Sequence, residues 1–158
     1  MYLTAPVTFI AILGCGVTAG IMFAFSAFVM DALGRLPAPQ GIAAMQSINI
    51  VIINPLFLLV FLGSTLLCLL LCGTTLFNPQ QPGAMWRLLG AVLFIVGVTF
   101  VTATFNVPLN NELDRVDPAS LEGAKLWEHY LTVWTRWNHV RTLGAISATV
   151  SLVIASQK

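Results

Sequence analysis

Four long stretches without a charged side chain constrain this sequence more than any other feature. Residues 1–30, 36–86, 88–111 and 142–157 contain no Asp, Glu, Lys or Arg. A helix that crosses the hydrocarbon core of a bilayer needs about 17 to 25 mainly apolar residues. Only 8% of the residues are charged and 58% are hydrophobic, whereas soluble domains have roughly 25% charged residues. The sequence therefore predicts an integral membrane protein, in contact with the lipid bilayer.

The first apolar segment is interpreted as a retained helix. A secretory signal peptide would begin with a basic region, but the first basic residue is Arg35. The apolar stretch is also longer than the about 7 to 15 residues of a signal-peptide core. The net charge of +1 and the lack of a separate basic cluster argue against nucleic-acid binding.

Residues typical of turns divide the chain into four predicted helices. The breaks are the Pro/Gly-rich segment 33–41, the NPQQPG turn at 78–83, and the NVPLNN motif at 106–111, where Pro108 should end a regular helix. The predicted helices span about 6–33, 41–77, 84–105 and 124–155. Uniformly apolar runs favour helices over a β-barrel. We expect an all-α fold with one domain, an antiparallel four-helix bundle in the membrane.

Small residues at four-residue spacing predict close helix contacts. Gly16 and Gly20 form one GxxxG pattern, and Gly144 with Ala148 forms a related pattern. Such spacing lets two helix backbones approach in a membrane. The sequence is also compatible with a homo-oligomer.

The unusual polar residues gather at one end of the predicted bundle. In four antiparallel spans, the end of helices one and three meets the start of helices two and four. This end contains Ser26, Asp31, Gln46, Asn49, Asn54, Asn106, Asn110, Asn111 and segment 134–141. The opposite end has only Arg87, Lys158 and a Pro/Gln turn. Amides that merely join helices would be expected at both ends, so the asymmetry favours a functional pocket.

The last helix places ionisable groups inside the membrane. Arg141 lies thirteen residues before Ile154, about 20 Å along a helix, which is less than a hydrocarbon core of about 30 Å. Arg141, Asn138 and His139 should therefore lie below the interface. An ionisable side chain at that depth is costly and indicates function. Helical spacing puts Trp134, Trp137, Asn138 and Arg141 on one stripe, beside a second stripe with His139.

These residues could support catalysis without a cofactor. His139 can act as a base near neutral pH, with Asp31 as the second candidate. Oxyanion stabilisation is assigned to Arg141, to Asn138 beside it and to the amides of Gln46, Asn49, Asn106 and Asn110. Trp134 and Trp137 could stack on a planar aromatic substrate.

Other interpretations of the same residues stay open. Tryptophans at a helix entry are often interfacial anchors, and buried amides often join helices. No metal site is predicted, because His129 and His139 are turned about 80° apart on one helix. Spacing alone is compatible with a haem that has one or two axial histidines, with His139 as the ligand in this alternative.

Five motifs carry a resemblance to a known family. They are FSAFVMDAL (25–33), GIAAMQSIN (41–49), NPLF (54–57), NVPLNN (106–111) and WTRWNHVRT (134–142). Together they resemble the anthrone oxygenase-like family of small four-helix membrane proteins, whose members are mostly bacterial. The resemblance implies oxidation of an anthrone to an anthraquinone by molecular oxygen, with no evident metal or flavin. The matching positions are Asn106, Pro108, Asn110, Trp134, Trp137, Asn138 and Arg141.

The resulting hypothesis is a cofactor-independent oxygenase of a planar phenolic or anthrone-type molecule, with that lipophilic molecule and molecular oxygen as its partners. A haem- or quinone-binding protein that uses His139 is the alternative, and a noncatalytic lipophile-binding subunit is the third. The expected location is a bacterial inner membrane. The excess of Lys and Arg at the polar end predicts that this end faces the cytoplasm.

Overall fold

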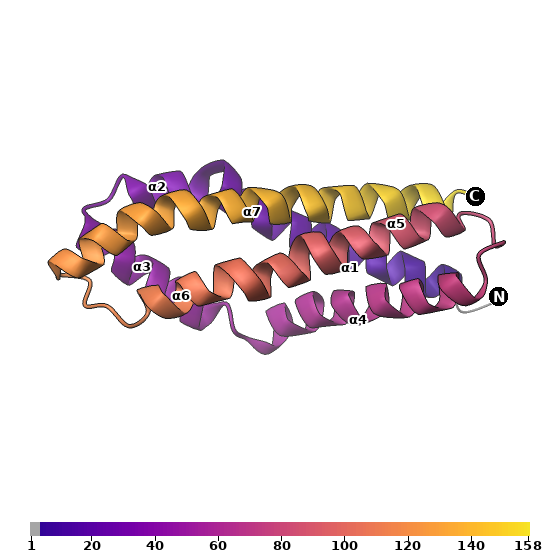
Figure 1. Cartoon of the computed structure of the whole chain (residues 1–158), viewed down its shortest axis with the longest axis horizontal. Helices are drawn as coiled ribbons and strands as arrows, with labels where there is room; N and C mark the ends of the chain where they lie inside the picture. Colours follow the sequence, from indigo (N-terminus) through magenta and orange to yellow (C-terminus); the bar gives the residue numbers. More distant parts are fainter. Residues whose placement is uncertain (1–3) are drawn as a thin grey trace.

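A computed structural model describes residues 4–158 (Figure 1), and in this range the chain is an all-α bundle without a strand. Four continuous helical stretches are long and apolar enough to cross a membrane, Thr4–Gly34, Pro55–Phe77, Ala84–Leu113 and Leu121–Ser156. The first and third pack along the fourth, and the second packs against the first and third. The start of the first stretch and the end of the fourth lie at the same end of the bundle (Figure 1). The predicted membrane four-helix bundle is confirmed.

Each stretch is built from the following elements. The first contains α1 (Thr4–Ala24), η1 (Phe25–Val29) and α2 (Met30–Gly34), and α3 (Ala38–Val51) follows it. The second is α4 (Pro55–Phe77). The third contains α5 (Ala84–Phe94), η2 (Ile95–Phe100), η3 (Thr102–Asn106) and α6 (Val107–Leu113). The fourth is α7 (Leu121–Ser156). The three η segments are π-helical, with backbone hydrogen bonds that span one residue more than in an α-helix.

The helix predicted over 41–77 is two helices, α3 and α4. The break comes at Asn54, whose side-chain oxygen accepts hydrogen bonds from the backbone N–H groups of Leu56 (3.1 Å) and Phe57 (3.0 Å). Pro55 then occupies the first helical position, where its missing N–H costs nothing. The Asn54-Pro55 pair therefore starts a new helix and separates α3 from the membrane-crossing helix α4.

The third helix continues past the position where the sequence predicted its end. It reaches Leu113 rather than residue 105, and Pro108 lies inside it, in the first turn of α6. The π-helical segment η3 directly precedes this turn. A π turn shifts the hydrogen-bond register by one residue, which accommodates a proline that would interrupt a regular α-helix. Similarly, α7 starts at Leu121, before the predicted residue 124, because the Ser120 hydroxyl caps it by accepting from the N–H of Gly123 at 2.9 Å.

Glycines at one predicted contact bring two helix backbones together, and at the other only Gly16 faces another helix. A Cβ added to Gly144 would lie 3.1 Å from the Cα of Gly97, so η2 and α7 touch backbone to backbone. Ala148, one turn further along α7, is fully buried. Gly20, in contrast, has no neighbouring atom within 4 Å of such a Cβ. The contact predicted at Gly144 is confirmed. In the other pattern Gly16 faces α7, since a Cβ added to it would lie 3.9 Å from Thr149, whereas Gly20 lies on the outer face of α1.

Candidate functional site

A cavity of about 280 Å³ lies at the end of the bundle where the first and last spans meet α3, α4 and α6. Most of its wall is aliphatic or aromatic, and the polar groups lie on α3, η3, α6 and α7. The polar or indole-bearing residues of this wall are Asn49, Thr102, Asn110, Trp134 and Arg141. An apolar cavity with a few converging polar groups is the usual form of a small-molecule site. We refer to it as the polar-end pocket.

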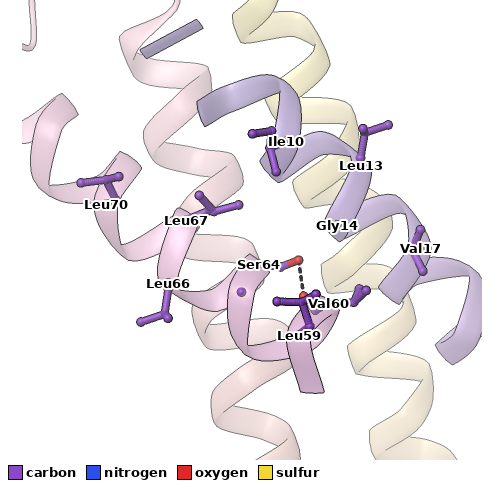
Figure 2. A pocket seen from close by; sticks show the side chains of 11 residues that line it. Ile10, Leu13, Gly14, Val17, Leu59, Val60, Ser64, Leu66, Leu67 and Leu70 are labelled. Carbon is purple, nitrogen blue, oxygen red and sulfur yellow. Dashed lines mark hydrogen bonds between the residues drawn. The ribbon is translucent and has the colours of Figure 1, made fainter. Parts of the chain in front are cut away.

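A larger groove of about 620 Å³ runs between α1 and α4 on the outside of the bundle (Figure 2). Its wall is aliphatic, with side chains such as Leu13, Val17 and Leu67 around it. The hydroxyl of Ser64 is satisfied by donating to the backbone carbonyl of Val60 at 2.6 Å (Figure 2). Because no ionisable side chain lines this groove, the smaller polar-end pocket is the better candidate for chemistry.

Arg141 is the one charged side chain on the wall of the polar-end pocket. It is only 5% exposed. Its Nη2 donates to Asn138 Oδ1 at 2.7 Å, its Nη1 is 3.4 Å from Thr102 Oγ1, and its Nε has no protein partner. The guanidinium carbon lies 4.9 Å from the centre of the Trp134 ring, a cation–π geometry. Within residues 4–158 the single ion pair joins Arg35 to Asp31, so no carboxylate neutralises Arg141.

Asn138 fixes the position of this guanidinium. Its side chain is fully buried, and its amide nitrogen donates to the Met22 carbonyl and to the Ser26 hydroxyl, both at 2.8 Å. These acceptors lie at the π-helical segment η1, which begins at Phe25. With its nitrogen held by the first span, the amide must present its oxygen to Arg141. Asn138 therefore couples the first span to the charge on the last one.

Asn110 organises a second part of the wall. Its Oδ1 accepts hydrogen bonds from the Tyr130 hydroxyl at 2.8 Å and from the Trp134 indole at 2.7 Å. Two donors on the same atom establish which end of the amide is oxygen. The amide nitrogen of Asn110 therefore remains a donor at the pocket. Asn49 lies on the same wall and donates to Asp114 Oδ1 at 3.4 Å.

The remaining predicted amides and the second tryptophan lie behind the pocket wall. Asn106 is buried and donates to the Trp134 carbonyl at 3.2 Å, while its own side-chain oxygen has no partner. Gln46 donates to the carbonyls of Leu113 and Val116, at 2.8 and 3.0 Å, and so fastens α3 to the end of α6. Trp137 stacks on Phe105, with 3.7 Å between ring centres. These residues support the wall and do not line the cavity.

The structure does not place His139 and Asp31 in the pocket, where the sequence had grouped them. Both side chains are exposed, and neither lines the cavity. Asp31 instead pairs with Arg35 at 2.7 Å, on the outside of α2. His139 follows Asn138, and consecutive residues of a helix point about 100° apart. Because Asn138 and Arg141 face the core, His139 is turned to the outer face of α7.

Two supporting residues, Tyr130 and Thr102, were not predicted. Tyr130 is fully buried and stacks between Trp127 and Trp134, with ring centres 5.6 and 5.7 Å away. Its spacing from those tryptophans puts all three on one helix face, which was a usable sequence signal. Thr102 had no comparable signal, because it reaches the site through the π-helical segment η3, whereas Ser26, in η1, had been placed at this end from the sequence.

Possible cofactor ligands are not gathered in this region. Within the described part of the chain, no three His, Cys, Asp or Glu side chains lie close enough to hold a metal ion together. His129 and His139 are both exposed. The sulfur atoms of Cys15 and Cys68 approach to 3.9 Å, but they lie in the apolar half of the bundle, among α1 and α4 residues.

Comparison with known proteins identifies the family. The sequence matches the anthrone oxygenase family over residues 57–151, which is more than half of the chain. This protein belongs to the anthrone oxygenase family. The matched range includes the pocket residues of α4, η3, α6 and α7, with Asn110, Trp134 and Arg141 among them. It also includes Asn106 and Asn138, which support the wall. No curated protein and no solved structure matches the chain. Membership supports an oxygenase-like function in general.

Proposed function

We propose that this protein is a membrane-embedded oxygenase that converts a planar phenolic or anthrone-type substrate into a quinone, with molecular oxygen and without a cofactor. The site is the polar-end pocket, and the bilayer is a bacterial inner membrane. The substrate is lipophilic, because aliphatic and aromatic side chains make up most of the wall. Trp134 offers an indole edge and face for a planar ring, and Arg141, Asn49 and Asn110 supply its polar contacts.

One observation carries this proposal, namely the buried and unneutralised guanidinium of Arg141. A cation at membrane depth is costly unless an anion or strong acceptors compensate it. The protein supplies the two oxygens of Asn138 and Thr102, leaving the Nε donor of Arg141 unpaired. A bound enolate or phenolate would supply the missing negative charge. The site is thus better matched to a deprotonated phenol than to a neutral ligand.

The chemistry follows from that preference. Loss of one methylene proton turns an anthrone into an enolate whose oxygen lies against Arg141. The electron-rich carbon then transfers electrons to molecular oxygen and forms a C–O bond, which gives a hydroperoxide after protonation. Loss of the second methylene hydrogen with cleavage of the O–O bond gives the ketone and one molecule of water. Overall, one CH₂ group and one O₂ become one C=O group and one H₂O.

The pocket wall contains no conventional base that could accept the first methylene proton of the substrate. Arg141 is a cation and acts by lowering the energy of the enolate, which makes the substrate a stronger acid. Asn49 is hydrogen-bonded to the carboxylate of Asp114 at the exposed end of the site. We assign proton acceptance to Asp114 or to water next to it.

The two alternative functions, haem binding and noncatalytic lipophile binding, assign different roles to these residues. A haem ligated by His139 would lie on the outer face of α7, away from the polar wall. A noncatalytic lipophile-binding subunit would use the same pocket and the same tryptophan, but would not consume oxygen. Consumption of oxygen therefore distinguishes the proposed oxygenase from a noncatalytic binding subunit. A haem absorption band in the purified protein would indicate the haem-binding protein instead.

The test is oxygen uptake by detergent-purified, chelator-treated protein supplied with a hydroxyanthrone, with the anthraquinone product measured in parallel. We expect uptake above the spontaneous rate, equal to the quinone formed. Arg141→Gln should lower it by roughly 100-fold or more, as expected for the loss of a preorganised donor to an oxyanion. Arg136→Gln is the matched control, since Arg136 is exposed on the same helix. Uptake that survives Arg141→Gln would reject the proposal, and ligand binding without uptake would establish the noncatalytic function instead.

A further inference from the structure

The rim of the polar-end pocket lies on the outer surface of the bundle. Four aliphatic residues line the pocket and are at least 36% exposed, Ile53, Leu58, Leu62 and Val107. Ile53 lies at the break before α4, the two leucines lie on the first turns of α4, and Val107 begins α6. The range 36–86 and the range 88–111 contain no charged residue. An opening with such a rim faces hydrocarbon rather than water.

The helices on the two sides of this rim diverge. Along its length α4 packs against α1, α5 and η2, but in residues 4–158 it makes no comparable contact with η3 or α6. The cause is local, because Asn54 and Pro55 begin α4 as a new helix that is not continuous with α3. The first two turns of α4 therefore leave a gap beside α6, and the pocket reaches the surface there.

The pocket also has two chemically different ends. Arg141, Asn49 and Asn110 lie toward α7 and α3, while the exposed rim is purely aliphatic. Its volume of about 280 Å³ is at the lower limit of the roughly 300 to 1,000 Å³ of small-molecule sites. Such a pocket has room for the ring system of a ligand, but a long substituent would have to extend through the rim.

We infer that the polar-end pocket opens sideways into the bilayer between α4 and α6, and that its ligand is a membrane-dissolved aromatic with an aliphatic chain lying in this opening. The deprotonated ring oxygen faces Arg141, and the chain passes between Leu58, Leu62 and Val107 into the lipid. The identity of the aromatic ring rests on the proposed function. The position of the aliphatic chain rests on the exposed aliphatic rim.

The experiment measures equilibrium binding to the protein in lipid nanodiscs, without oxygen turnover. The two probes are a hydroxyanthraquinone and the same ring with a decyl chain. Binding of each probe is measured by the change in its own absorption. In the unmodified protein the two dissociation constants should agree within about threefold, because the chain only exchanges one apolar environment for another. Leu62→Trp, which fills the opening, should weaken binding of the decyl probe by roughly tenfold or more and affect the bare ring much less.

Leu69→Trp is the matched control, because Leu69 is also 49% exposed on α4 but lies two turns away from the pocket rim. It should leave both dissociation constants unchanged. Leu58→Trp repeats the test if Leu62→Trp does not fold. A decyl probe that binds the unmodified protein more than about tenfold more weakly than the bare ring would show that the pocket encloses its ligand completely, against this inference.

Equal weakening of both probes by Leu62→Trp would also overturn the lateral opening. These results are separable from the test of the proposed function. A protein that tolerates the decyl chain but consumes no oxygen contradicts only the oxygenase function. A protein that oxidises the bare ring but rejects the chain contradicts only the opening.

Discussion

The two halves of this bundle share the first, third and fourth helical stretches but are packed on different principles. In the half that contains the start of α1 and the end of α7, these two helices meet α4 and α5 through a core of small and aliphatic residues such as Ala11, Ala91 and Ala148. In the other half, the core contains Trp127, Tyr130 and Trp134, and buried amides lie beside its aliphatic side chains. The first half holds the helices together, and the second holds a pocket between them.

Two of the three π-helical segments coincide with this difference, while the third, η2, lies in the apolar half, where its Gly97 contacts Gly144. The segments η1 and η3 lie on the first and third spans beside the polar-end pocket, next to Ser26 and Asn106. The second span, α4, is a regular helix, and it is also the wall with the fewest polar contacts. Wide turns give up regular hydrogen bonding, and they are common at functional sites because they redirect side chains. The site was formed by local departures from ideal bundle geometry.

The largest effect should come from removing the two buried arginines, one from each half. Arg141→Met should abolish turnover while raising thermal stability, because a buried charge without a carboxylate partner is removed from the bundle. Arg87, which is 7% exposed and donates to the Pro82 carbonyl at 3.2 Å, is the comparison. Arg87→Met should change stability and leave turnover intact. Equal losses of turnover would contradict the functional difference between the halves, and oxygen uptake with thermal unfolding measures both quantities.

A smaller effect is expected from Asn138→Leu, which keeps the side-chain size but removes the hydrogen bonds to Met22 and Ser26. Because the guanidinium of Arg141 is then no longer held in place, turnover should fall by roughly tenfold to 100-fold, as expected when a group at a reacting centre is misplaced. Thermal stability should fall only slightly, because hydrogen bonds between membrane helices contribute about 0.6 kcal/mol on average. Asn111→Leu, at an exposed asparagine, is the control. A large stability loss without a change in turnover per folded molecule would make Asn138 purely structural.

The contact between Gly144 and Gly97 provides a test of helix packing in the apolar half. Gly144→Leu would push α7 away from Gly97, and we expect a loss of about 1 to 3 kcal/mol of stability from overpacking. Gly20→Leu places the same side chain where nothing lies within 4 Å and should be neutral. Unfolding temperatures in one detergent would compare the two variants. If Gly20→Leu is the more destabilising, the outer face of α1 has a partner in the membrane.

The smallest effect is expected at His139. Because its side chain is exposed on the outer face of α7, His139→Ala should change turnover by less than about twofold. Turnover measured across pH 5 to 9 would give a further check, since a histidine base would make the profile change with the substitution. Strong loss of activity would restore His139 as the base and show that the pocket extends around α7.

The sequence was sufficient for the class of fold and for the end of the bundle that carries the site. Uncharged runs determine transmembrane helices because hydrocarbon does not tolerate charges or unpaired backbone groups. Antiparallel connectivity then brings Asn49, Asn110, Trp134 and Arg141 to one end, and the structure places all four on the wall of the polar-end pocket.

Tertiary structure alone decided which helix face points inward and how the pocket opens. Asn138 and His139 are neighbours in sequence and equally polar, but packing buries the first and exposes the second. Periodicity relates residues on one helix to each other and carries no information on where the other helices lie. The π turns at Ser26 and Asn106, and the gap beside α4, depend on the same contacts between helices. The sequence by itself determined the membrane bundle and the polar end, and packing determined which residues line the pocket there.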